Sequence, residues 1–315
     1  MGHSAARRMI ASLAIGGLAA GAITGAASPV LAAGATHPAA MSESALGNHD
    51  GAPIAARYTA NDRARVANGD PRPVGRLLAY DRHGAGRIVE VMGNLATARR
   101  IAVIVPGMGW NAGRVLKERN TNPDGPVMGA VALADRMRHD APGLPTAVVM
   151  WLGYHPPTGI DVDVMRSTRA AAGANRLLSF LRGLPGRARL TLVCHSYGAV
   201  VCGRAASRLP HQVGDLVALA APGMDVRTAA GLRTTARVWT ARANDDPIRF
   251  TPFVRVGGFG HGTDPVSARF GAVVMRTGSA TGHSHYFRPG TESLENVARI
   301  ADGHRAEVTR RADAS

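Results

Sequence analysis

Residues 190–199, which read LTLVCHSYGA, decide the fold. The mostly apolar start is typical of a buried strand, and the residues after Ser196 have helical spacing. A serine at such a junction, with a glycine two residues later, matches the second half of the G-x-S-x-G motif, in which a strained turn exposes the serine hydroxyl. Gly198 supplies the small residue where strand and helix nearly touch, whereas Cys194 replaces the first glycine. The alternative is an ordinary junction in which Ser196 only caps the helix.

Similar apolar runs recur along the chain, separated by stretches with helical spacing. The first two runs flank a turn-forming segment at 81–86, which predicts a hairpin. Alternation of buried strands with helices predicts an α/β fold, with a mostly parallel central sheet and helices on both faces. The expected strands are residues 77–80, 87–91, 100–105, 146–152, 190–193, 215–219, 238–240 and 271–275, and the expected helices include 127–139, 164–182 and 197–209.

Polar residues follow several of these runs, where a parallel sheet collects its ligand-binding residues. A nucleophilic serine needs a base within about 3 Å, and the base needs an orienting carboxylate. After the run at 238–240 the chain offers Asp245 and Asp246, and after the run at 271–275 it offers His283. Serine, acid and histidine therefore occur in an order that is known for catalytic triads.

A serine nucleophile also needs N–H donors for the oxyanion that forms on its substrate. The backbone amide of Tyr197 is the first expected donor, and the amide of Met108, in the glycine-rich turn at 106–110, is the second. That turn could also be a plain connection, but no G-K-[ST] follows it, which argues against a phosphate loop. Segments 110–126 and 153–163 are expected to border the site, although ordinary surface loops would have the same composition.

Over residues 76–303 the sequence resembles the α/β-hydrolase superfamily, and most closely a group of uncharacterised exported actinobacterial proteins of that fold. The likeness rests on HSYG at 195–198, DDPI at 245–248, GHGTDP at 260–265 and HSHY at 283–286. The resemblance implies an α/β-hydrolase fold with Ser196 as nucleophile, Asp246 rather than Asp245 as orienting acid, and His283 as general base. Such a triad requires no cofactor.

His285 and His261 compete with His283 for the role of base. The HSHY motif aligns His283, and His261 precedes the last expected strand, so both rivals are interpreted as hydrogen-bonded loop histidines. With Asp264 these histidines could suggest zinc, but no H-x-x-x-H or H-E-x-x-H spacing occurs. We therefore expect no metal site.

The chain has 315 residues and a formal charge of +15, carried almost entirely by arginine, since Lys117 is its only lysine. The arginines are scattered and aromatic residues make up 4% of the chain, which argues against a nucleic-acid-binding surface. A basic surface of this kind is compatible with weak, salt-dependent contact with anionic cell-envelope polymers.

The N-terminal residues 1–33 have the pattern of a signal peptide, with two arginines, an apolar stretch and a small-residue exit. Residues 34–73 are interpreted as a flexible Ala/Gly/Pro-rich spacer with one short helix around 60–67, residues 74–303 as the hydrolase domain, and 304–315 as a charged tail. This organisation predicts a secreted or cell-envelope-associated protein with no membrane span after signal cleavage.

The cysteines are Cys194 and Cys202, eight positions apart. In an exported protein such a pair suggests a disulfide, but two small buried thiols are an equal alternative. A disulfide requires the two Cα atoms to lie within about 7 Å of each other, and the sequence does not give that distance.

Together these features predict an exported serine hydrolase of esterase or lipase type, acting on a small-molecule or lipid ester through an acyl-enzyme. The alternatives are an acyltransferase acting on cell-envelope hydroxyls and a catalytically silent binding module of the same fold.

Overall fold

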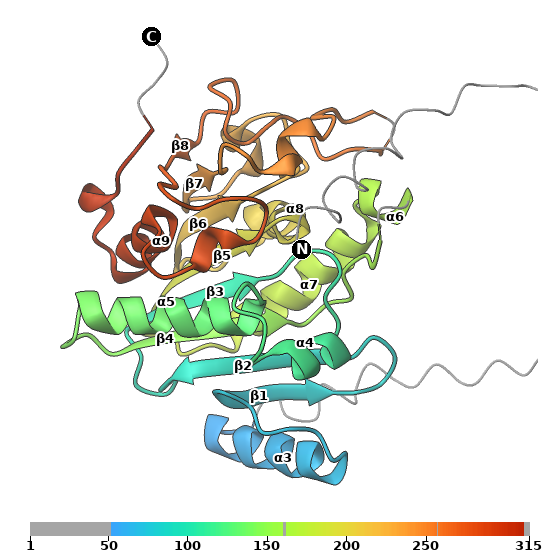
Figure 1. Cartoon of the computed structure of the whole chain (residues 1–315), viewed down its shortest axis with the longest axis vertical. Coiled ribbons are helices and arrows are strands. Elements are labelled where there is room, and N and C mark those ends of the chain that lie inside the picture. Colours follow the sequence, from blue (N-terminus) through green and yellow to red (C-terminus); the bar gives the residue numbers. More distant parts are fainter. Residues whose placement is uncertain (1–51, 160–161, 257, 312–315) are drawn as a thin grey trace, which may run out of the picture. The chain divides into compact units, whose positions relative to one another are not determined.

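The apolar runs form one eight-stranded sheet in the computed structural model of the protein, which describes residues 52–159, 162–256 and 258–311 (Figure 1). The strand order is β1-β2-β4-β3-β5-β6-β7-β8. The pairs β1–β2 and β2–β4 are antiparallel, and every other pair is parallel. The strands are β1 (Arg76–Asp81), β2 (Arg87–Gly93), β3 (Arg100–Val105), β4 (Thr146–Leu152), β5 (Arg189–His195), β6 (Val213–Leu219), β7 (Arg237–Ala241) and β8 (Val273–Val274).

Helices cover both faces of the sheet, as the sequence predicts (Figure 1). In β3, Ile101 and Val103 belong to the apolar cluster that contains the helices α7 and α8, whereas Ala102 and Ile104 belong to the cluster that contains α4, α5 and α9. This two-sided burial explains the continuous apolar runs. The helices are α3 (Ile54–Ala67), α4 (Ala112–Glu118), α5 (Pro126–Asp140), α6 (Val162–Met165), α7 (Thr168–Arg182), α8 (Tyr197–Ala205) and α9 (Glu292–Asp302).

Several elements differ from the sequence prediction in extent. The single helix expected over 164–182 is divided into α6 and α7, because Arg166 pairs with Phe259 as an isolated bridge between them. The strand expected over 271–275 is reduced to β8. Met275 donates from its amide to the Thr240 carbonyl of β7 at 2.8 Å and also forms an isolated bridge with Arg310 near the end of the chain. Helices α4 and α9 are not among those predicted.

Helix α3 is longer than the short helix expected in the spacer, and it is attached to the sheet. Its Asn61 amide donates to the Leu78 carbonyl of β1 at 2.9 Å, and Arg57 donates to the same carbonyl at 3.3 Å. Tyr58 is 9% exposed and lies beneath the Arg76 guanidinium. Residues 54–67 are therefore not a flexible spacer, and the folded unit begins before residue 74. The predicted signal peptide at 1–33 lies outside the described residues.

The predicted charged tail is also attached to the domain as far as residue 311. Thr309 exchanges hydrogen bonds with the Asn296 side chain of α9, at 3.0 Å and 2.8 Å. Arg305 forms an ion pair with Asp215 of β6 at 2.6 Å. These contacts correct the boundary expected at residue 303. Within the described ranges, no helix has the length and apolar content needed to cross a bilayer.

Candidate functional site

The turn between β5 and α8 holds Ser196 in a strained conformation, with φ 54° and ψ −127°. A positive φ is rare for a residue with a side chain and persists only where the surroundings fix it. Here the Ser196 amide donates to the Leu219 carbonyl of β6 at 2.9 Å. A Cβ on Gly198 would lie 2.2 Å from the Val105 carbonyl oxygen, so the position requires glycine. The Ser196 side chain makes no capping bond to α8, which argues against the helix-cap alternative.

Cys194 and Cys202 form a disulfide, with their Cα atoms 6.5 Å apart. Both residues are fully buried, at 0% exposure. The bridge joins the end of β5 to α8 on either side of the Ser196 turn. The disulfide, which the sequence left open, is therefore present. It links β5 to α8, the two elements that position Ser196.

Ser196 lies at one end of a hydrogen-bonded chain that contains an imidazole and a carboxylate. His283 Nε2 is 2.8 Å from Ser196 Oγ, and His283 Nδ1 is 2.8 Å from Asp246 Oδ1. Because a carboxylate only accepts, Nδ1 carries the proton and Nε2 is left to accept from the serine hydroxyl. Asp246 has 0% side-chain exposure, and the His283 side chain is 28% exposed. The structure thus brings together the three side chains that the sequence predicts to converge.

Asp246 is fixed by three donors. It accepts from His283, from the Ile248 amide at 2.9 Å, and from the Tyr286 hydroxyl at 2.6 Å. Burial by itself raises the pKa of Asp246, but the hydrogen bonds from His283, Tyr286 and Ile248, with the charge of His283, outweigh burial and hold the pKa below its usual value. The carboxylate is therefore ionised and can orient an imidazole and stabilise its charge.

Asp245, the other carboxylate of the DDPI motif, has a different place. Its Oδ1 accepts from the Gly282 amide at 2.8 Å, directly before His283 in the chain. Asp245 therefore fixes the turn that carries His283, while Asp246 contacts the ring itself.

Two residues missed by the sequence analysis complete this network. The Tyr286 hydroxyl accepts from the Ala243 amide at 2.8 Å while it donates to Asp246. His195 Nε2 lies 2.6 Å from the His283 carbonyl oxygen and therefore donates to it. Burial, with His283 nearby, lowers the pKa of His195 to about 4, so the ring is neutral at pH 7. The only sequence signal was that both residues lie in the HSYG and HSHY motifs.

The rival histidines lie in other environments. His261 is 3% exposed, has its ring against Tyr197, and its Nε2 donates to the Val164 carbonyl at 2.7 Å. His285 hydrogen-bonds to Thr281 at 2.8 Å and lies 3.4 Å from an Asp124 oxygen. Both are hydrogen-bonded histidines, as interpreted from the sequence.

One expected oxyanion donor, the Tyr197 amide, directly follows Ser196 in the chain, and the turn that contains the other, Met108, lies against Ser196. Tyr197 is the first residue of α8, where the helix dipole is positive. The turn that contains Met108 approaches from β3, since a Cβ on Gly107 would lie 2.6 Å from the Ser196 Cβ. The segment after β4 holds this turn: the Tyr154 hydroxyl donates to the Pro106 carbonyl at 2.7 Å, and the Gly109 amide donates to the Pro157 carbonyl at 2.8 Å.

A small cavity of about 50 Å³ adjoins His195 and Ser284 at the site. Part of its wall comes from the segment 110–126, which the sequence predicts to border the site. The Arg288 guanidinium holds that segment in place, because it donates two hydrogen bonds to the Asp124 carboxylate, at 2.6 Å and 2.7 Å. The lining residues are Ile104, Pro106, Trp110, Asp124, Gly125, Pro126, His195, Ser284 and Phe287. In the part of the chain that the structure describes, no three His, Cys, Asp or Glu side chains are grouped as metal ligands.

Comparison with known proteins agrees with this architecture. A sequence model of a family described as alpha/beta hydrolase matches residues 81–256, and the chain belongs to that family. The α/β-hydrolase fold expected from the resemblance is confirmed. Two uncharacterised proteins of Mycobacterium tuberculosis, from strains CDC 1551 and H37Rv, are each 31% identical to the chain over 277 residues. The match covers 76% of this chain and 41% of each relative, so the chain spans less than half of their length.

Solved structures with a similar chain path include two from other organisms. A protein from Thermoplasma acidophilum described as a predicted CIB-like hydrolase is 12% identical, with a TM-score of 0.45, and the match covers 72% of this chain and 97% of that one. A Trichoderma reesei cutinase is 13% identical, with a TM-score of 0.40, and the match covers 81% of this chain and 90% of that one.

Proposed function

We propose that this protein is a serine hydrolase that cleaves carboxylic esters through an acyl-enzyme, with Ser196 as nucleophile, His283 as base and Asp246 as orienting acid. The observation that carries the proposal is the continuous hydrogen-bonded chain from Ser196 Oγ through both nitrogens of His283 to Asp246. Serine is a weak nucleophile unless a positioned base removes its proton, and this chain is an arrangement that activates it.

In the first half of the reaction, Ser196 Oγ attacks the ester carbonyl carbon as His283 Nε2 takes the hydroxyl proton. The carbonyl oxygen becomes an oxyanion, which the backbone amides of Tyr197 and Met108 stabilise. When the tetrahedral intermediate collapses, the bond to the alcohol oxygen breaks, and His283 returns its proton to that oxygen. Ser196 is left as an ester of the acyl group.

In the second half, water replaces the alcohol. His283 takes a proton from the water as its oxygen attacks the acyl carbon, and then returns the proton to Ser196 as the free acid leaves. Asp246 keeps its charge throughout and stabilises the imidazolium. His195 holds the His283 backbone through the carbonyl, so the ring stays aligned with Ser196. No cofactor enters these steps.

The same proposal includes export to the cell envelope or medium. The pattern of residues 1–33 supports export, and so does the buried Cys194–Cys202 disulfide, because disulfides persist mainly in oxidising compartments. The arginine-rich composition supports weak contact with anionic envelope polymers.

A fluorophosphonate probe tests the proposed nucleophile. The wild-type protein should be labelled at Ser196, and Ser196→Ala should abolish labelling and lower kcat on p-nitrophenyl esters about 10⁶-fold. Ser279→Ala is the matched control, because Ser279 is an exposed serine that bonds only weakly, at 3.4 Å, to the Gly290 carbonyl. It should retain wild-type labelling.

Other outcomes would select an alternative. A correctly folded wild type that resists the probe and binds envelope polymers would support the silent binding module. A labelled enzyme that forms more transfer product than acid, with a hydroxyl acceptor present, would support an acyltransferase. A series of p-nitrophenyl esters of increasing chain length would then define the acyl group.

A further inference from the structure

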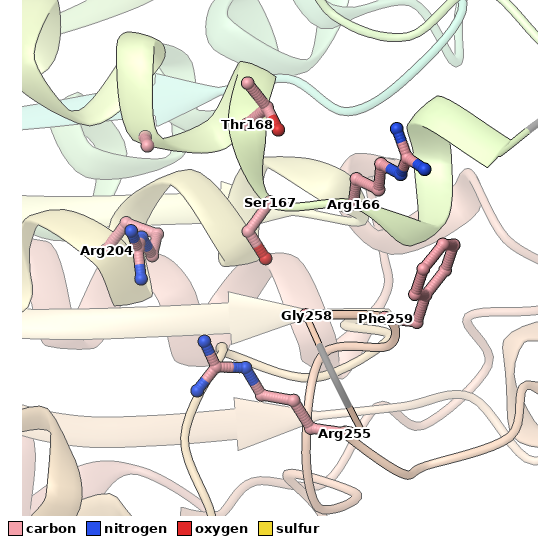
Figure 2. Close-up of a pocket in the computed structure, with 8 residues that line it drawn as sticks. Arg166, Ser167, Thr168, Arg204, Arg255, Gly258 and Phe259 are labelled. Carbon is pink, nitrogen blue, oxygen red and sulfur yellow. The ribbon is translucent and has the colours of Figure 1, made fainter.

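A second cavity, of about 440 Å³, lies between the start of α7, the end of α8 and the residues Arg255, Gly258 and Phe259 (Figure 2). It shares no lining residue with the triad or with the small cavity beside it. The lining residues are Arg166, Ser167, Thr168, Ala171, Arg204, Arg255, Gly258 and Phe259. The proposed ester hydrolysis gives this cavity no role.

The cavity is strongly basic. Its described lining residues carry three guanidinium groups and no carboxylate. Arg204 and Arg255 both form ion pairs with Asp225, whose side chain is 1% exposed. The Arg204 and Arg255 side chains are 41% and 42% exposed, so their guanidinium groups are accessible to a ligand.

Asp225 fixes two of these arginines in place. Arg204 Nη1 lies 2.9 Å from one carboxylate oxygen, and Arg255 Nε lies 2.9 Å from the other. The Ser167 hydroxyl also donates to Asp225, at 2.9 Å. A guanidinium has five N–H donors, and these bonds occupy one on each arginine. The two guanidinium groups share one buried carboxylate, so one net positive charge remains. The N–H groups that do not bond to Asp225 are held in fixed directions.

The Arg204 and Arg255 guanidinium groups and the Ser167 hydroxyl lie toward one end of the cavity and come from three different segments of the chain (Figure 2). At the other end of the cavity, the Arg166 guanidinium stacks on the Phe259 ring, 5.0 Å from its centroid. One end therefore presents a fixed pair of cations, and the other presents a further cation on an aromatic wall.

We propose that Arg204 and Arg255 form a binding site for a phosphoryl group. A carboxylate has two oxygens, which one guanidinium can satisfy through a bidentate contact. Two guanidinium groups on different elements suit an anion with three or more oxygens arranged in a tetrahedron. Arg166 and Phe259 would contact whatever the phosphoryl group is attached to.

Isothermal titration of the full chain with inorganic phosphate, at constant ionic strength, tests the site. The wild type should bind saturably, and Arg204→Gln or Arg255→Gln should raise Kd at least about tenfold, because each removes a charge-assisted hydrogen bond. Arg82→Gln is the matched control: Arg82 is 40% exposed and pairs with Asp70 elsewhere. An equal loss in Arg82→Gln, or saturable binding that neither Arg204→Gln nor Arg255→Gln weakens, would overturn the proposal.

A further variant separates binding from folding. Arg255→Lys keeps a positive charge beside Asp225, so the variant should keep the wild-type melting temperature. It loses the planar guanidinium with its fixed N–H donors, so it should bind phosphate more weakly than the wild type. Wild-type affinity in this variant would contradict the assignment of Arg255.

The source of the phosphoryl group is tested with vesicles. If it belongs to a lipid, the protein should sediment with phosphatidylglycerol vesicles, Arg255→Gln should reduce this binding, and Arg82→Gln should not. If it belongs to a free phosphate compound, inorganic phosphate should bind while sedimentation is the same for wild type and Arg255→Gln. A protein that binds neither probe would refute the site.

Discussion

Two buried carboxylates, one at the candidate site and one at the end of α9, have opposite ionisation behaviour. Asp246 is 0% exposed and accepts hydrogen bonds from three donors, which hold its pKa below the usual value. Asp302 is 2% exposed, and neither of its oxygens has a hydrogen-bond partner among the described residues. Burial, with Asp140 nearby, raises the pKa of Asp302 to about 7, although Arg100 opposes the shift.

The difference shows that partners, more than burial, determine the charge of an acid in this protein. Both side chains are removed from water to a similar extent, yet only Asp246 has donors that replace the lost hydration. At the site this produces a permanent anion beside His283. At the end of α9, the lack of donors leaves Asp302 as a neutral carboxylic acid whose ionisation costs free energy. The helix dipole adds to this cost, because a negative charge is unfavourable at a helix C-terminus.

Among changes to these two carboxylates and their partners, removal of the charge at Asp246 should have the largest effect. Asp246→Asn keeps the shape but replaces the acceptor of the His283 Nδ1 proton by an amide that can donate, so the ring is no longer held in the productive tautomer. We expect kcat on a p-nitrophenyl ester to fall about 10⁴-fold. Asp245→Asn, the same change one residue earlier, should lower kcat less than about tenfold, because it leaves the His283–Asp246 hydrogen bond in place. Equal losses in the two variants would contradict the assignment of the acid.

Asp302→Asn should have the next largest effect, on stability. In the unfolded chain Asp302 ionises above its usual pKa of 3.8, whereas in the folded protein it keeps its proton until about pH 7. The unfolded state therefore binds fewer protons between these values, and stability falls as pH rises through that window. Asp302→Asn cannot ionise, so at pH 8 it should raise the free energy of unfolding by roughly 2–4 kcal/mol.

Urea unfolding from pH 4 to pH 8 measures this effect. The gain in Asp302→Asn should be small at pH 4 and largest at pH 8. Asp135→Asn is the control, since the Asp135 side chain is 60% exposed in a surface ion pair with Arg138, and it should change stability by less than about 1 kcal/mol. A gain that is independent of pH would show that Asp302 does not titrate in this window.

Tyr286→Phe should have the smallest effect, because it removes one of the three donors to Asp246 and leaves the triad in place. We expect kcat to fall roughly tenfold and KM to change little, since one charge-assisted bond is worth about 1.5–3 kcal/mol and only part of it acts on His283. The pKa of Asp246 in the folded protein should rise toward its usual value, so ionised Asp246 should contribute less to the free energy of unfolding. On acidification, this contribution should disappear at a higher pH than in the wild type.

Tyr58→Phe provides the matched control for this change. The Tyr58 hydroxyl is buried without a hydrogen-bond partner among the described residues, so its removal should leave kcat and the acid-side stability unchanged. A Tyr286→Phe variant that behaves in the same way would show that Asp246 does not need its third donor.

Much of the site could be predicted because the residues after buried parallel strands share one edge of the sheet. The strand-exit argument indicated Ser196 and singled out the DDPI and HSHY motifs as sources of its acid and base. The choice of His283 over His285 depended on the resemblance at the HSHY motif. The choice between Asp245 and Asp246 depended on the resemblance, because consecutive residues in a turn point in different directions. Asp246 faces His283 because it precedes the 3-10 turn Pro247–Phe250 and accepts from the Ile248 amide.

The roles of His195 and Tyr286 could not be predicted for a similar reason. Each acts through one hydrogen bond to a residue at least 40 positions away, and no periodic pattern marks such a contact. Helix α3 was underestimated because its docking depends on Asn61, a polar residue that bonds to the edge strand and leaves no apolar stripe.

The sequence alone determined the alternation of buried strands and helices, the sharp turn at Ser196 and the order of serine, acid and histidine, because these follow from local preferences and from the period of apolar residues. Only the tertiary structure decided which carboxylate meets His283, that Cys194 and Cys202 are bridged, and that Asp225 gathers two arginines beside a cavity. These features depend on distances between residues that lie on different elements, and such distances are set by how the elements pack.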